Sequence, residues 1–590
     1  MEKCLILTSN KKFWPKKNNL YYLGNWCLEN IADSFKEKSK FKIISPNNNE
    51  KKLDINFNLT KKIYNNLIKD IAKELNKTLN KNFSTRFWEI IVGPWLREFI
   101  GFIIGKFDEL ENGLKNKSVN KILLANYSNI DINLVHTDDI ANKNPQENDL
   151  YCFIIYSKIF EFLKKRKIKT VKVKIRYGKE KSLIPTEVDF IHPNSFTIYI
   201  KKTISKILNL FRKKSDPFIY GVKLKTFDLI KLYLKLNLVP QINIMPSYKR
   251  VKINKNVRNK LNFKKKNINK IENFIRKILK EVMPTDYLEN FNELDKITDQ
   301  LKFPKKPKFI LTGHGYRNII FSYWVAKKTE KKIPYYLMQH GGNYFSFKHN
   351  SIIEPGFNTS KKFLSWGKIK SKKVLPLFNI NNLPYKKLYR SNSNKIFVYV
   401  TLMKSKRNKS YNNYEKMINE HRLMSSSLDG LKHKDKKNLI IRLHFTDQKF
   451  MRNKILKEIF FKKNKYQIDY STLPIKEVYK KSKLIIHGDD GTGILETLSL
   501  NIPSLFLMED LKLITKSCKK DYLKLKKGKI LFFNPKELSN HVNKYSNDIN
   551  KWWLNKKVIS IRRNFINKYS RPVPEKPITK LANLLSVVKR

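Results

Sequence analysis

The sequence predicts an α/β fold in which two domains each alternate strands and helices. From residue 307 onward, short apolar runs that fit buried strands alternate with segments of helical periodicity. The alternation breaks off at residues 375–389, a stretch with Pro and several Asn, and resumes at residue 396. Residues 484–507 follow a strand, loop, helix, strand pattern, the crossover that two parallel strands require. We therefore expect two Rossmann-like domains that face a cleft.

The N-terminal half adds extra helices to this plan. The aromatic side chains of residues 84–97 predict a helix anchored in the core, and Pro94 is expected to kink or end it. Residues 21–27 are expected to lead into a helix, and the very basic residues 254–280 to be mostly helical and solvated. Strands are expected at 4–8 and 121–125, and helices at 63–79, 84–97, 151–167, 198–210 and 227–238.

The break at residues 375–389 divides the chain. It predicts a first α/β domain with helical insertions (1–375), a linker (376–390), a second Rossmann-like domain (391–560) and a C-terminal helix and tail (561–590). In the sharply alternating part we expect strands at 308–312, 333–338, 362–366, 396–401, 439–444, 466–470, 484–486 and 504–507, and helices at 318–328, 414–426, 474–481, 494–500 and 558–568.

Composition indicates a globular chain with a strong positive charge. Of the 590 residues 41% are hydrophobic and 12% aromatic, whereas the formal net charge is +72. Such a charge favours nucleic acid, acidic lipid head groups or phosphorylated substrates. Lys is spread throughout, together with plentiful Asn, Ile, Phe and Tyr, so a bias toward A/T-rich codons is a competing explanation, which we favour. No zinc finger, RNP-type aromatic motif or compact helix-turn-helix accompanies the charge, and we predict no nucleic-acid partner.

Cysteines and apolar runs bear on the compartment. Cys4, Cys27, Cys152 and Cys518 are scattered, without a CxxC pair that would indicate zinc or a disulfide framework. That pattern fits a reducing cytosol. The first residues lack signal-peptide architecture, and the apolar patch at 99–105 is far below the ~20 residues that span a bilayer. We expect a cytoplasmic protein, at most attached to a membrane surface.

The loop at residues 487–493 is the first candidate site. Gly491 and Gly493 let the backbone approach a ligand, and His487 begins the loop. Thr492 can cap the following helix or donate its hydroxyl to an anion, and free N–H groups at a helix start suit a phosphate. Glu496, one turn on, could accept hydrogen bonds from ribose. The loop matches neither GxxxxGK[ST] nor GxGxxG, so an ordinary glycine-rich βα turn remains an equal alternative.

A second candidate site follows the strand expected at 333–338. His340 and the trailing Gly341, Gly342 and Asn343 lie where the carboxyl end of a strand meets a ligand cleft. A transfer reaction needs a base near the acceptor hydroxyl, and imidazole serves near neutral pH. The alternative is a histidine whose nitrogens are satisfied within a tight turn. His314, in a similar turn after the preceding strand, is a further cleft candidate.

Two more features concern charge. Arg442 and His444 lie two residues apart and so share one face of a strand, where they could meet a phosphate; a pair that faces water is the alternative.

Asp489 and Asp490 are adjacent carboxylates on a glycine-rich turn, which more often accept hydrogen bonds locally than hold a metal. We predict no metal requirement.

Four stretches of the chain carry a resemblance to a known family. They are LILT with YLGNWC, FWEIIVGPWL, QHGGNY with SWG, and GTGILETL with NIP, at residues 5–8 with 22–27, 87–96, 339–344 with 365–367, and 491–498 with 501–503. They resemble the transferases encoded in bacterial O-antigen and surface-polysaccharide gene clusters. The last stretch also resembles the wider group of GT-B glycosyltransferases, which includes capsule, Kdo, sialic acid and glycerol-phosphate transferases. His314 departs from the pattern, because a Ser-Asn-rich turn is expected there.

The resemblance implies a GT-B-like fold and a glycosyltransferase. Its first domain would bind a glycan or lipid-linked acceptor and its second a nucleotide-sugar donor, which is a substrate, so no cofactor is expected. His340 would be the base, the donor phosphate would meet residues Arg442, His444, Gly491, Thr492 and Gly493, and Glu496 would lie near the donor ribose. We expect peripheral contact with anionic lipid at the inner face of the cytoplasmic membrane. The alternatives are a noncatalytic polysaccharide-assembly protein on the same fold and a basic nucleic-acid-binding protein.

Overall fold

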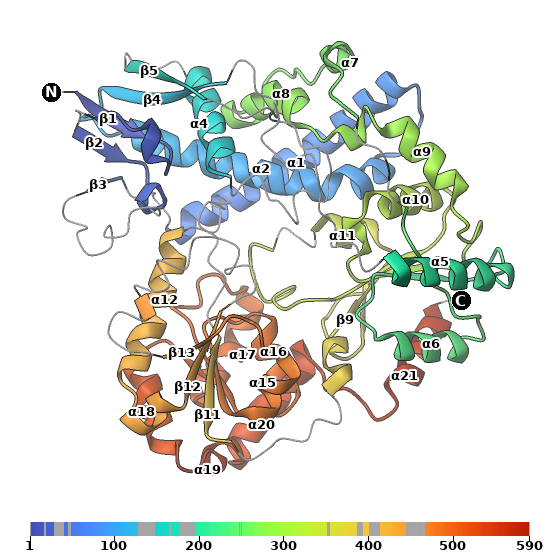
Figure 1. Ribbon diagram of the computed structural model, residues 1–590, viewed down its shortest axis with the longest axis vertical. Coiled ribbons are helices and arrows are strands. Elements are labelled where there is room, and N and C mark those ends of the chain that lie inside the picture. Colours follow the sequence, from blue (N-terminus) through green and yellow to red (C-terminus); the bar gives the residue numbers. More distant parts are fainter. Residues whose placement is uncertain are drawn as a thin grey trace.

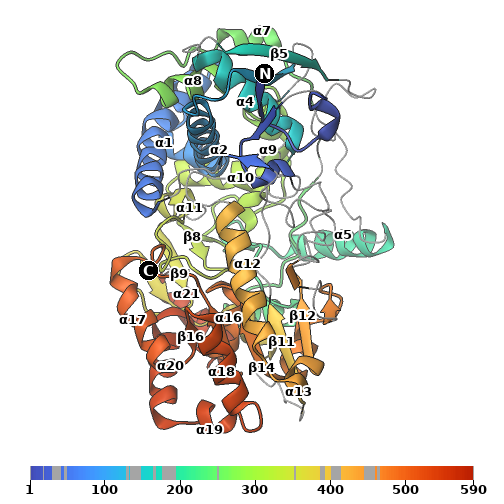
Figure 2. The same ribbon diagram turned by 90° about the vertical axis from the view of Figure 1, so that its left-hand side faces the viewer.

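The computed structural model contains three separate parallel sheets covered by helices, which confirms the α/β class (Figure 1). In Figures 1 and 2 the N-terminal sheet lies at the top, the C-terminal sheet at the bottom, and strands β8 and β9 of the middle sheet between them. The structure describes residues 2–16, 19–28, 41–44, 49–127, 132, 148–163, 168–175, 195–246, 248, 251–350, 354–385, 393–399, 414–443, 459–460 and 466–588.

The C-terminal sheet has six strands in the order β13-β12-β11-β14-β15-β16. Numbered along the chain this is 3-2-1-4-5-6, the strand order of the Rossmann fold, as predicted. Its strands are β11 (Lys395–Tyr399), β12 (Leu439–Arg442), β13 (Gln467–Asp469), β14 (Ser482–His487), β15 (Ser504–Leu507) and β16 (Leu531–Phe532). Its helices are α12 (Tyr414–Asp429), α13 (His433–Lys437), α15 (Ile475–Lys481), α16 (Thr492–Ser499), α17 (Lys516–Lys527), α18 (Pro535–Tyr545), α19 (Asn550–Trp553) and α20 (Lys556–Tyr569).

The middle sheet pairs its five strands in the order of the chain, from β6 to β10. Its central strand β8 is completely buried, as its apolar sequence YYLM requires. The strands are β6 (Phe218–Tyr220), β7 (Ile310–Thr312), β8 (Tyr335–Met338), β9 (Lys362–Ser365) and β10 (Val374–Pro376). The helices around it are α5 (Ser195–Leu210), α6 (Thr226–Lys235), α9 (Phe291–Gln300), α10 (Ile319–Glu330) and α11 (Glu354–Thr359).

The N-terminal sheet is separate from the middle sheet, a division that the sequence pattern did not reveal. Residues 21–27 contain the end of strand β2 and most of the 3-10 helix η2 (Asn25–Leu28), and the helix expected to follow them lies outside the described residues. Strand β5 was hidden because its lysines and short length resemble a basic loop, and most of it is exposed. The strands are β1 (Lys3–Ile6), β2 (Asn19–Tyr22), β3 (Lys42–Ile43), β4 (Lys121–Asn126) and β5 (Lys169–Lys174), with helix α4 (Asp149–Leu163) beside them.

Two long helices, α1 (Glu50–Leu79) and α2 (Thr85–Leu114), pack together next to this sheet. The extra helices predicted for the N-terminal half are thereby confirmed. Of the two outcomes expected at Pro94, a kink or an end of the helix, the end is wrong, because α2 continues for twenty residues beyond it. Burial on nearly all sides holds the helix together, with Trp88 and Trp95 almost fully enclosed. Gly93 lets α1 approach, since a Cβ there would meet the Tyr64 hydroxyl at 2.6 Å.

The basic segment 254–280 is less solvated than its charge suggested. Its two helices are α7 (Lys255–Lys260) and α8 (Lys270–Val282). Helix α8 buries Phe274, Ile275, Ile278 and Leu279, whereas its lysines lie on the other face. Apolar residues at helical spacing therefore decide where this segment packs, despite the lysines between them.

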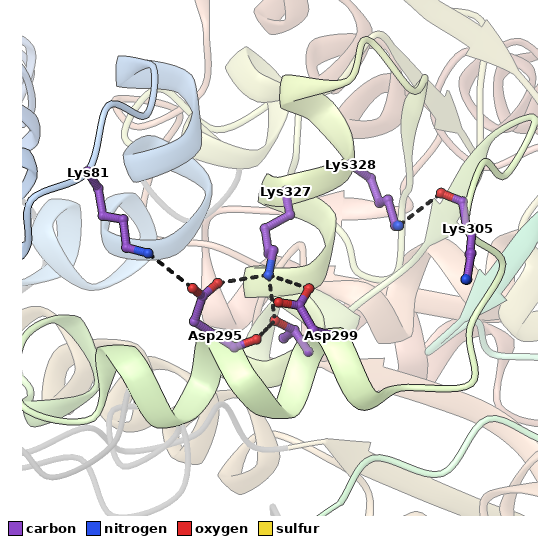
Figure 3. Close-up of polar contacts among 7 residues, drawn as sticks. Lys81, Asp295, Asp299, Lys305, Lys327 and Lys328 are labelled. Atoms are coloured by element: carbon purple, nitrogen blue, oxygen red, sulfur yellow. Dashed lines mark hydrogen bonds and ion pairs between the residues drawn. The ribbon is translucent and has the colours of Figure 1, made fainter.

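An ion cluster fastens the α1–α2 pair to the helices of the middle sheet (Figure 3). Asp295 on α9 lies between Lys81, which follows α1, and Lys327 on α10, at 3.3 and 2.8 Å. Lys327 also reaches Asp299 at 2.7 Å. Burial acts to raise the pKa of Asp295, but the hydrogen bonds from Lys327 and Lys81 outweigh it and lower that pKa.

The segment predicted as a linker is built into the structure. After β10, the 3-10 helix η7 (Ile380–Tyr385) buries Ile380 and Asn382, and Asn379 donates a hydrogen bond to the Ser570 hydroxyl at 2.9 Å. Residues 386–392 lie outside the described residues, and the domain boundaries remain a prediction.

The chain also returns to the middle sheet after α20. Arg571 forms backbone hydrogen bonds with Trp366 and Asn379 at 2.8 and 2.9 Å. Helix α21 (Pro577–Val588) then packs on α6 and buries Leu581 and Leu585 in the same cluster as Leu232 (Figure 1). Two stretches of chain therefore connect the middle and C-terminal sheets. Among the described residues, no helix is both long and apolar enough to cross a bilayer.

Candidate functional site

The loop after β8 is held by a tryptophan. Trp366 donates its backbone N–H to the Gln339 side-chain oxygen at 2.8 Å and its indole N–H to the Gln339 carbonyl at 3.0 Å. The Gln339 amide in turn donates to the carbonyl of Gly341 at 2.9 Å. These bonds explain why QHGGN and SWG occur together, since one motif fixes the backbone of the other.

This loop meets the glycine-rich loop of the C-terminal sheet. The backbone N–H of Gly342 donates to the Thr492 hydroxyl at 2.9 Å, and a Cβ on Gly342 would lie 2.8 Å from the backbone of Gly491. Asn343, in the left-handed region at φ 62°, donates to Asp490 at 3.0 Å. The two predicted loops are thus brought together at the carboxyl ends of their strands, as in the expected GT-B-like plan. Thr492 binds the opposite loop instead of capping its own helix, for which no side-chain cap is formed.

His340 lies at this junction and is half-buried. The Tyr344 hydroxyl is 2.9 Å from its Nδ1 and 3.1 Å from its Nε2. Burial lowers the pKa of His340 to about 3, with further contributions from Arg317, Lys223 and His314. The imidazole is therefore neutral at physiological pH and can accept a proton.

Three neighbouring strands deliver polar side chains to the same edge of the middle sheet. His314 and His340 each lie two residues beyond their strands, β7 and β8, and their ring centroids are 6.1 Å apart. Lys223 follows β6, and its Nζ lies 3.3 Å from the carbonyl oxygen of His340. In the described part of the chain, the buried Nδ1 of His314 has no hydrogen-bond partner. Burial, then Arg317 and Lys223, lowers the pKa of His314.

Sequence reasoning missed the cations at this edge. Lys223 and Arg317 are exposed, and both act on the pKa values of His314 and His340. Lys223 also acts on Glu496. Nothing in the sequence distinguishes Lys223 from the other lysines around it. Its position one turn after a buried strand at the middle sheet's edge is the only signal, and it requires knowledge of which strands are neighbours.

Glu496 is held by protein groups. Its two carboxylate oxygens accept hydrogen bonds from the Asn381 amide at 2.7 Å and the Tyr479 hydroxyl at 2.9 Å. Burial raises the pKa of Glu496, and these hydrogen bonds partly oppose the shift. Asn381, which the sequence analysis did not single out, belongs to η7 and also approaches the His340 carbonyl at 3.5 Å. Its buried side-chain oxygen lacks a hydrogen-bond partner among the described residues.

The two adjacent aspartates act as local acceptors. Asp489 accepts the backbone N–H of Gly491 at 3.0 Å, and Asp490 accepts the Tyr522 hydroxyl at 2.9 Å. Burial, followed by repulsion from Asp489, raises the pKa of Asp490 to about 6. Within the described ranges, no group of three or more His, Cys, Asp or Glu could hold a metal ion. Metal independence remains a prediction.

His487 is a core residue. It is 2% exposed, its Nε2 lies 3.2 Å from the Thr497 hydroxyl, and its ring stacks on Tyr399. Burial alone lowers its pKa to about 3. Gly493 makes room for this ring, because a Cβ there would lie 2.9 Å from it. His487 and Gly493 therefore support the loop from its core side.

Arg442 is already paired. Its guanidinium forms an ion pair with buried Asp469 and donates to the Leu473 carbonyl at 3.0 Å. The expectation that it meets a phosphate therefore lacks support from its contacts, because Asp469 neutralises its charge. His444, the other half of that expected pair, lies outside the described residues.

A small cavity lies behind His340. It has a volume of about 30 Å³, enough for roughly two water-sized groups and too little for a sugar ring. The cavity is lined by side chains from α2, β8, α11 and the loops between, among them Glu89, Pro94, Tyr316, Tyr344, Gly356 and Phe363.

Comparison with known proteins gives one extended match. The family model described as LIC12162 family transferase matches residues 3–585. No curated protein sequence is significantly similar to the chain.

Solved structures show a distant likeness. A glycosyltransferase from Rickettsia africae ESF-5 is 16% identical, with a TM-score of 0.32 over 54% of this chain and 86% of that one. MnaA of S. aureus, solved with UDP, is 14% identical, with a TM-score of 0.34 over 62% and 100%. MurG of Acinetobacter baumannii is 12% identical, with a TM-score of 0.31 over 64% and 100%. At such TM-scores we base no conclusion on these structures.

Proposed function

The chain belongs to the LIC12162 family of transferases, and on that premise we propose that it is a GT-B-type glycosyltransferase. It would move a sugar from a nucleotide-activated donor to a glycan or lipid-linked acceptor. The observation that carries the proposal is the junction of the loop after β8 with the start of α16. It sets a neutral imidazole, a helix N-terminus and two exposed cations around one edge.

His340 is the proposed base. Its unprotonated ring can take the proton of the acceptor hydroxyl, and Tyr344 holds the ring through a hydrogen bond at 2.9 Å. A pKa of about 3 makes it a weak base in the free protein. A donor phosphate bound beside Lys223 and Arg317 would offset their charges, which contribute to that low pKa. Donor binding would therefore raise the pKa of His340 and strengthen the base once the substrate is present.

Lys223 and Arg317 are proposed to stabilise the leaving phosphate. Both are exposed at the carboxyl edge of the middle sheet, where His340 lies, and their positive charges help to lower the pKa of its ring. Free backbone N–H groups at the start of α16 add a favourable dipole, as originally expected for Thr492. This assignment replaces Arg442, whose partner is Asp469.

The test is nucleotide binding measured by thermal shift. A ligand that binds only the folded state raises the melting temperature, so UDP, TDP and other nucleoside diphosphates are screened together with the corresponding nucleotide sugars. Lys223→Gln and Arg317→Gln should each weaken the best ligand by about tenfold, since a hydrogen bond to a charged group contributes ~1.5–3 kcal/mol. Lys225→Gln, an exposed lysine two residues away, is the matched control. Equal shifts in all three variants would refute the assignment of the cations.

The cellular role is a finer part of the proposal. The resemblance to O-antigen and surface-polysaccharide transferases supports an acceptor in that pathway at the inner face of the cytoplasmic membrane. We propose that the reaction needs no metal, since the leaving phosphate would meet Lys223 and Arg317. A noncatalytic assembly protein is the alternative. Radiolabelled sugar transfer is therefore measured with and without excess EDTA. A metal-independent enzyme would transfer sugar in both, a metal-dependent enzyme would stop in EDTA, and a noncatalytic protein would bind nucleotide without turnover in either.

A further inference from the structure

Helix α5 exposes an apolar face to solvent. Seven exposed side chains, six of them apolar, lie at positions i, i+1, i+4, i+5, i+8, i+11 and i+12 from Tyr199 to Phe211, which at 3.6 residues per turn is one face of the helix. Leu210 is 81% exposed and Tyr199 69%. In a globular protein such a face normally points to the core. The face consists of Tyr199, Ile200, Thr203, Ile204, Ile207 and Leu210, continued by Phe211 just after the helix.

The opposite, polar face of α5 rests on the protein. The Ser205 hydroxyl donates to the carbonyl of Ile242 at 2.8 Å, and the Asn209 amide approaches Ser205 at 3.5 Å. Arg212, just beyond the helix, donates to the Lys302 carbonyl and to Asn243. The helix is therefore attached with its polar side inward, and Figure 2 shows it projecting from the body of the molecule.

Helix α6 repeats the pattern on a smaller scale. Phe227, Ile230 and Leu234, at i, i+3 and i+7, are 65%, 36% and 59% exposed, while Leu232 and Tyr233 face the core. Along the chain, α5 precedes and α6 follows β6, the edge strand of the middle sheet that leads to Lys223. Each of the two helices therefore exposes a group of apolar side chains of the kind that marks an interaction surface.

The charge around α5 is uniformly positive. Between Asp189 and Asp216 the sequence contains no acidic residue but five lysines and one arginine. Lys206, Lys213 and Lys214 are exposed next to the apolar face. A helix with an apolar face and a basic rim lies in the interface of a bilayer, with its side chains among the acyl chains and its cations at anionic head groups.

We propose that α5, assisted by α6, docks the protein on a bilayer that contains anionic phospholipid. Charge complementarity favours this occupant over a second copy of the chain, since two copies would bring their lysines together. The inference adds a binding surface to the proposed transfer reaction and does not depend on it. It names residues for the lipid contact that the net charge alone only suggested.

Sedimentation of the full chain with vesicles tests the proposal. The wild type should bind vesicles of phosphatidylcholine with phosphatidylglycerol, and bind pure phosphatidylcholine vesicles more weakly. The double variant I204E/I207E should bind the anionic vesicles at least about tenfold more weakly, because two apolar side chains are lost from the interface and two anions are added. Both positions are exposed, so the melting temperature should stay unchanged.

L523E/L554E is the matched control. Leu523 and Leu554 are 47% and 53% exposed, against 41% and 54% for Ile204 and Ile207, but belong to the C-terminal domain. This control should bind vesicles as the wild type does. The triple variant K206Q/K213Q/K214Q should lose at least about twentyfold in affinity at low salt, since each of the three charges near the surface contributes about threefold or more.

Three results would overturn the proposal. The first is unchanged vesicle binding by I204E/I207E. The second is equal binding of the wild type to neutral and anionic vesicles at low salt. The third is a wild-type dimer that I204E/I207E converts to a monomer in solution, with vesicle binding absent in both, which would assign the face to a second copy of the chain. Nucleotide binding at the proposed donor site should be unaffected throughout, so a failure here is distinct from a failure of the proposed function.

Discussion

Two histidines with the same local sequence pattern have different surroundings. His340 and His487 each follow an apolar strand and precede glycine, and the pKa of each is lowered to about 3. For His487 burial is the only cause, and its ring is enclosed by Tyr399, Thr497 and the space that Gly493 leaves. For His340 the cations Lys223 and Arg317 add to burial.

The difference teaches that a low pKa alone does not identify a functional histidine. A ring inside the core loses its proton because water is excluded, and it stays inaccessible to a substrate. A ring beside exposed cations loses its proton partly through charges that an anionic ligand can offset. The identity of the neighbours therefore separates a structural histidine from a candidate base.

The largest expected effect is on turnover. His340→Ala should lower the transfer rate by ~10²–10⁴-fold, because a general base contributes that much, and should leave nucleotide binding near the wild-type value. His487→Gln, which can still hydrogen-bond to Thr497, should retain most of the rate. Radiolabelled sugar transfer and thermal shift with nucleotide measure the two properties separately.

Two results for His340→Ala would contradict the distinction between His340 as a candidate base and His487 as a core histidine. A folded His340→Ala protein that no longer binds nucleotide would place His340 in the donor site. Intact transfer by the same variant would exclude it as the base.

The next effect concerns the junction beside His340. Gly342→Ala should lower the free energy of unfolding by about 1–3 kcal/mol, since its Cβ would lie 2.8 Å from the backbone of Gly491 and Thr492, which cannot move aside as a flexible side chain would. Gly341→Ala is the matched control, because its Cβ would meet only the Thr492 and Tyr344 side chains at an ordinary 3.6 Å. Urea denaturation of both variants checks the difference; equal stabilities would mean that the two loops do not touch in solution.

The pH dependence of stability distinguishes the core histidine. The unfolded chain protonates His487 near pH 6.5, whereas the folded protein does so only at about 3. As the pH falls below 6.5, the wild type therefore loses stability by ~1.4 kcal/mol per pH unit at this residue. His487→Gln lacks this loss, so its stability relative to the wild type should rise by about 2 kcal/mol between pH 6.5 and pH 5. Denaturation at both pH values measures it, and a difference independent of pH would mean that His487 protonates normally when folded.

The smallest effect is expected at Thr492. Thr492→Val removes the hydroxyl that accepts the Gly342 N–H and keeps the side-chain shape, which should cost about 1 kcal/mol of stability. Thr492→Ser, which keeps the hydroxyl, should cost less than half of that. Thermal denaturation ranks the two, and a reversed order would show that packing of the methyl group, not the hydrogen bond, joins the loops.

Much of the fold follows from local sequence, and less of the site. Strands β11 to β15 of the C-terminal sheet were predicted from their short apolar runs, whereas β16, with only two residues, was not. Strand β5 was not, since an exposed edge strand of alternating Lys, Thr and Val has no apolar run. The expectation that Pro94 could end α2 was wrong because the stability of this helix comes from burial along its whole length, which a pattern of neighbouring residues does not reveal.

The site shows the same division. The loops at His340 and Thr492 were predictable from glycines that follow apolar strands. Lys223 and Asn381 were not, because a lysine among many lysines and an asparagine in an assumed linker acquire a role only through the neighbours that the sheet order supplies. The ion pair of Arg442 was not predictable for the complementary reason, since its partner Asp469 comes from the adjacent strand β13.

The return of the chain to the middle sheet has a consequence for biosynthesis. Leu581 and Leu585 on α21 complete a cluster whose members outside that helix, such as Leu232, are translated long before them. During synthesis this early-made surface stays uncovered until the whole C-terminal domain has left the ribosome. The nascent chain therefore exposes this surface while the C-terminal domain is being made, and a premature stop within α21 would damage a part of the protein that was made earlier.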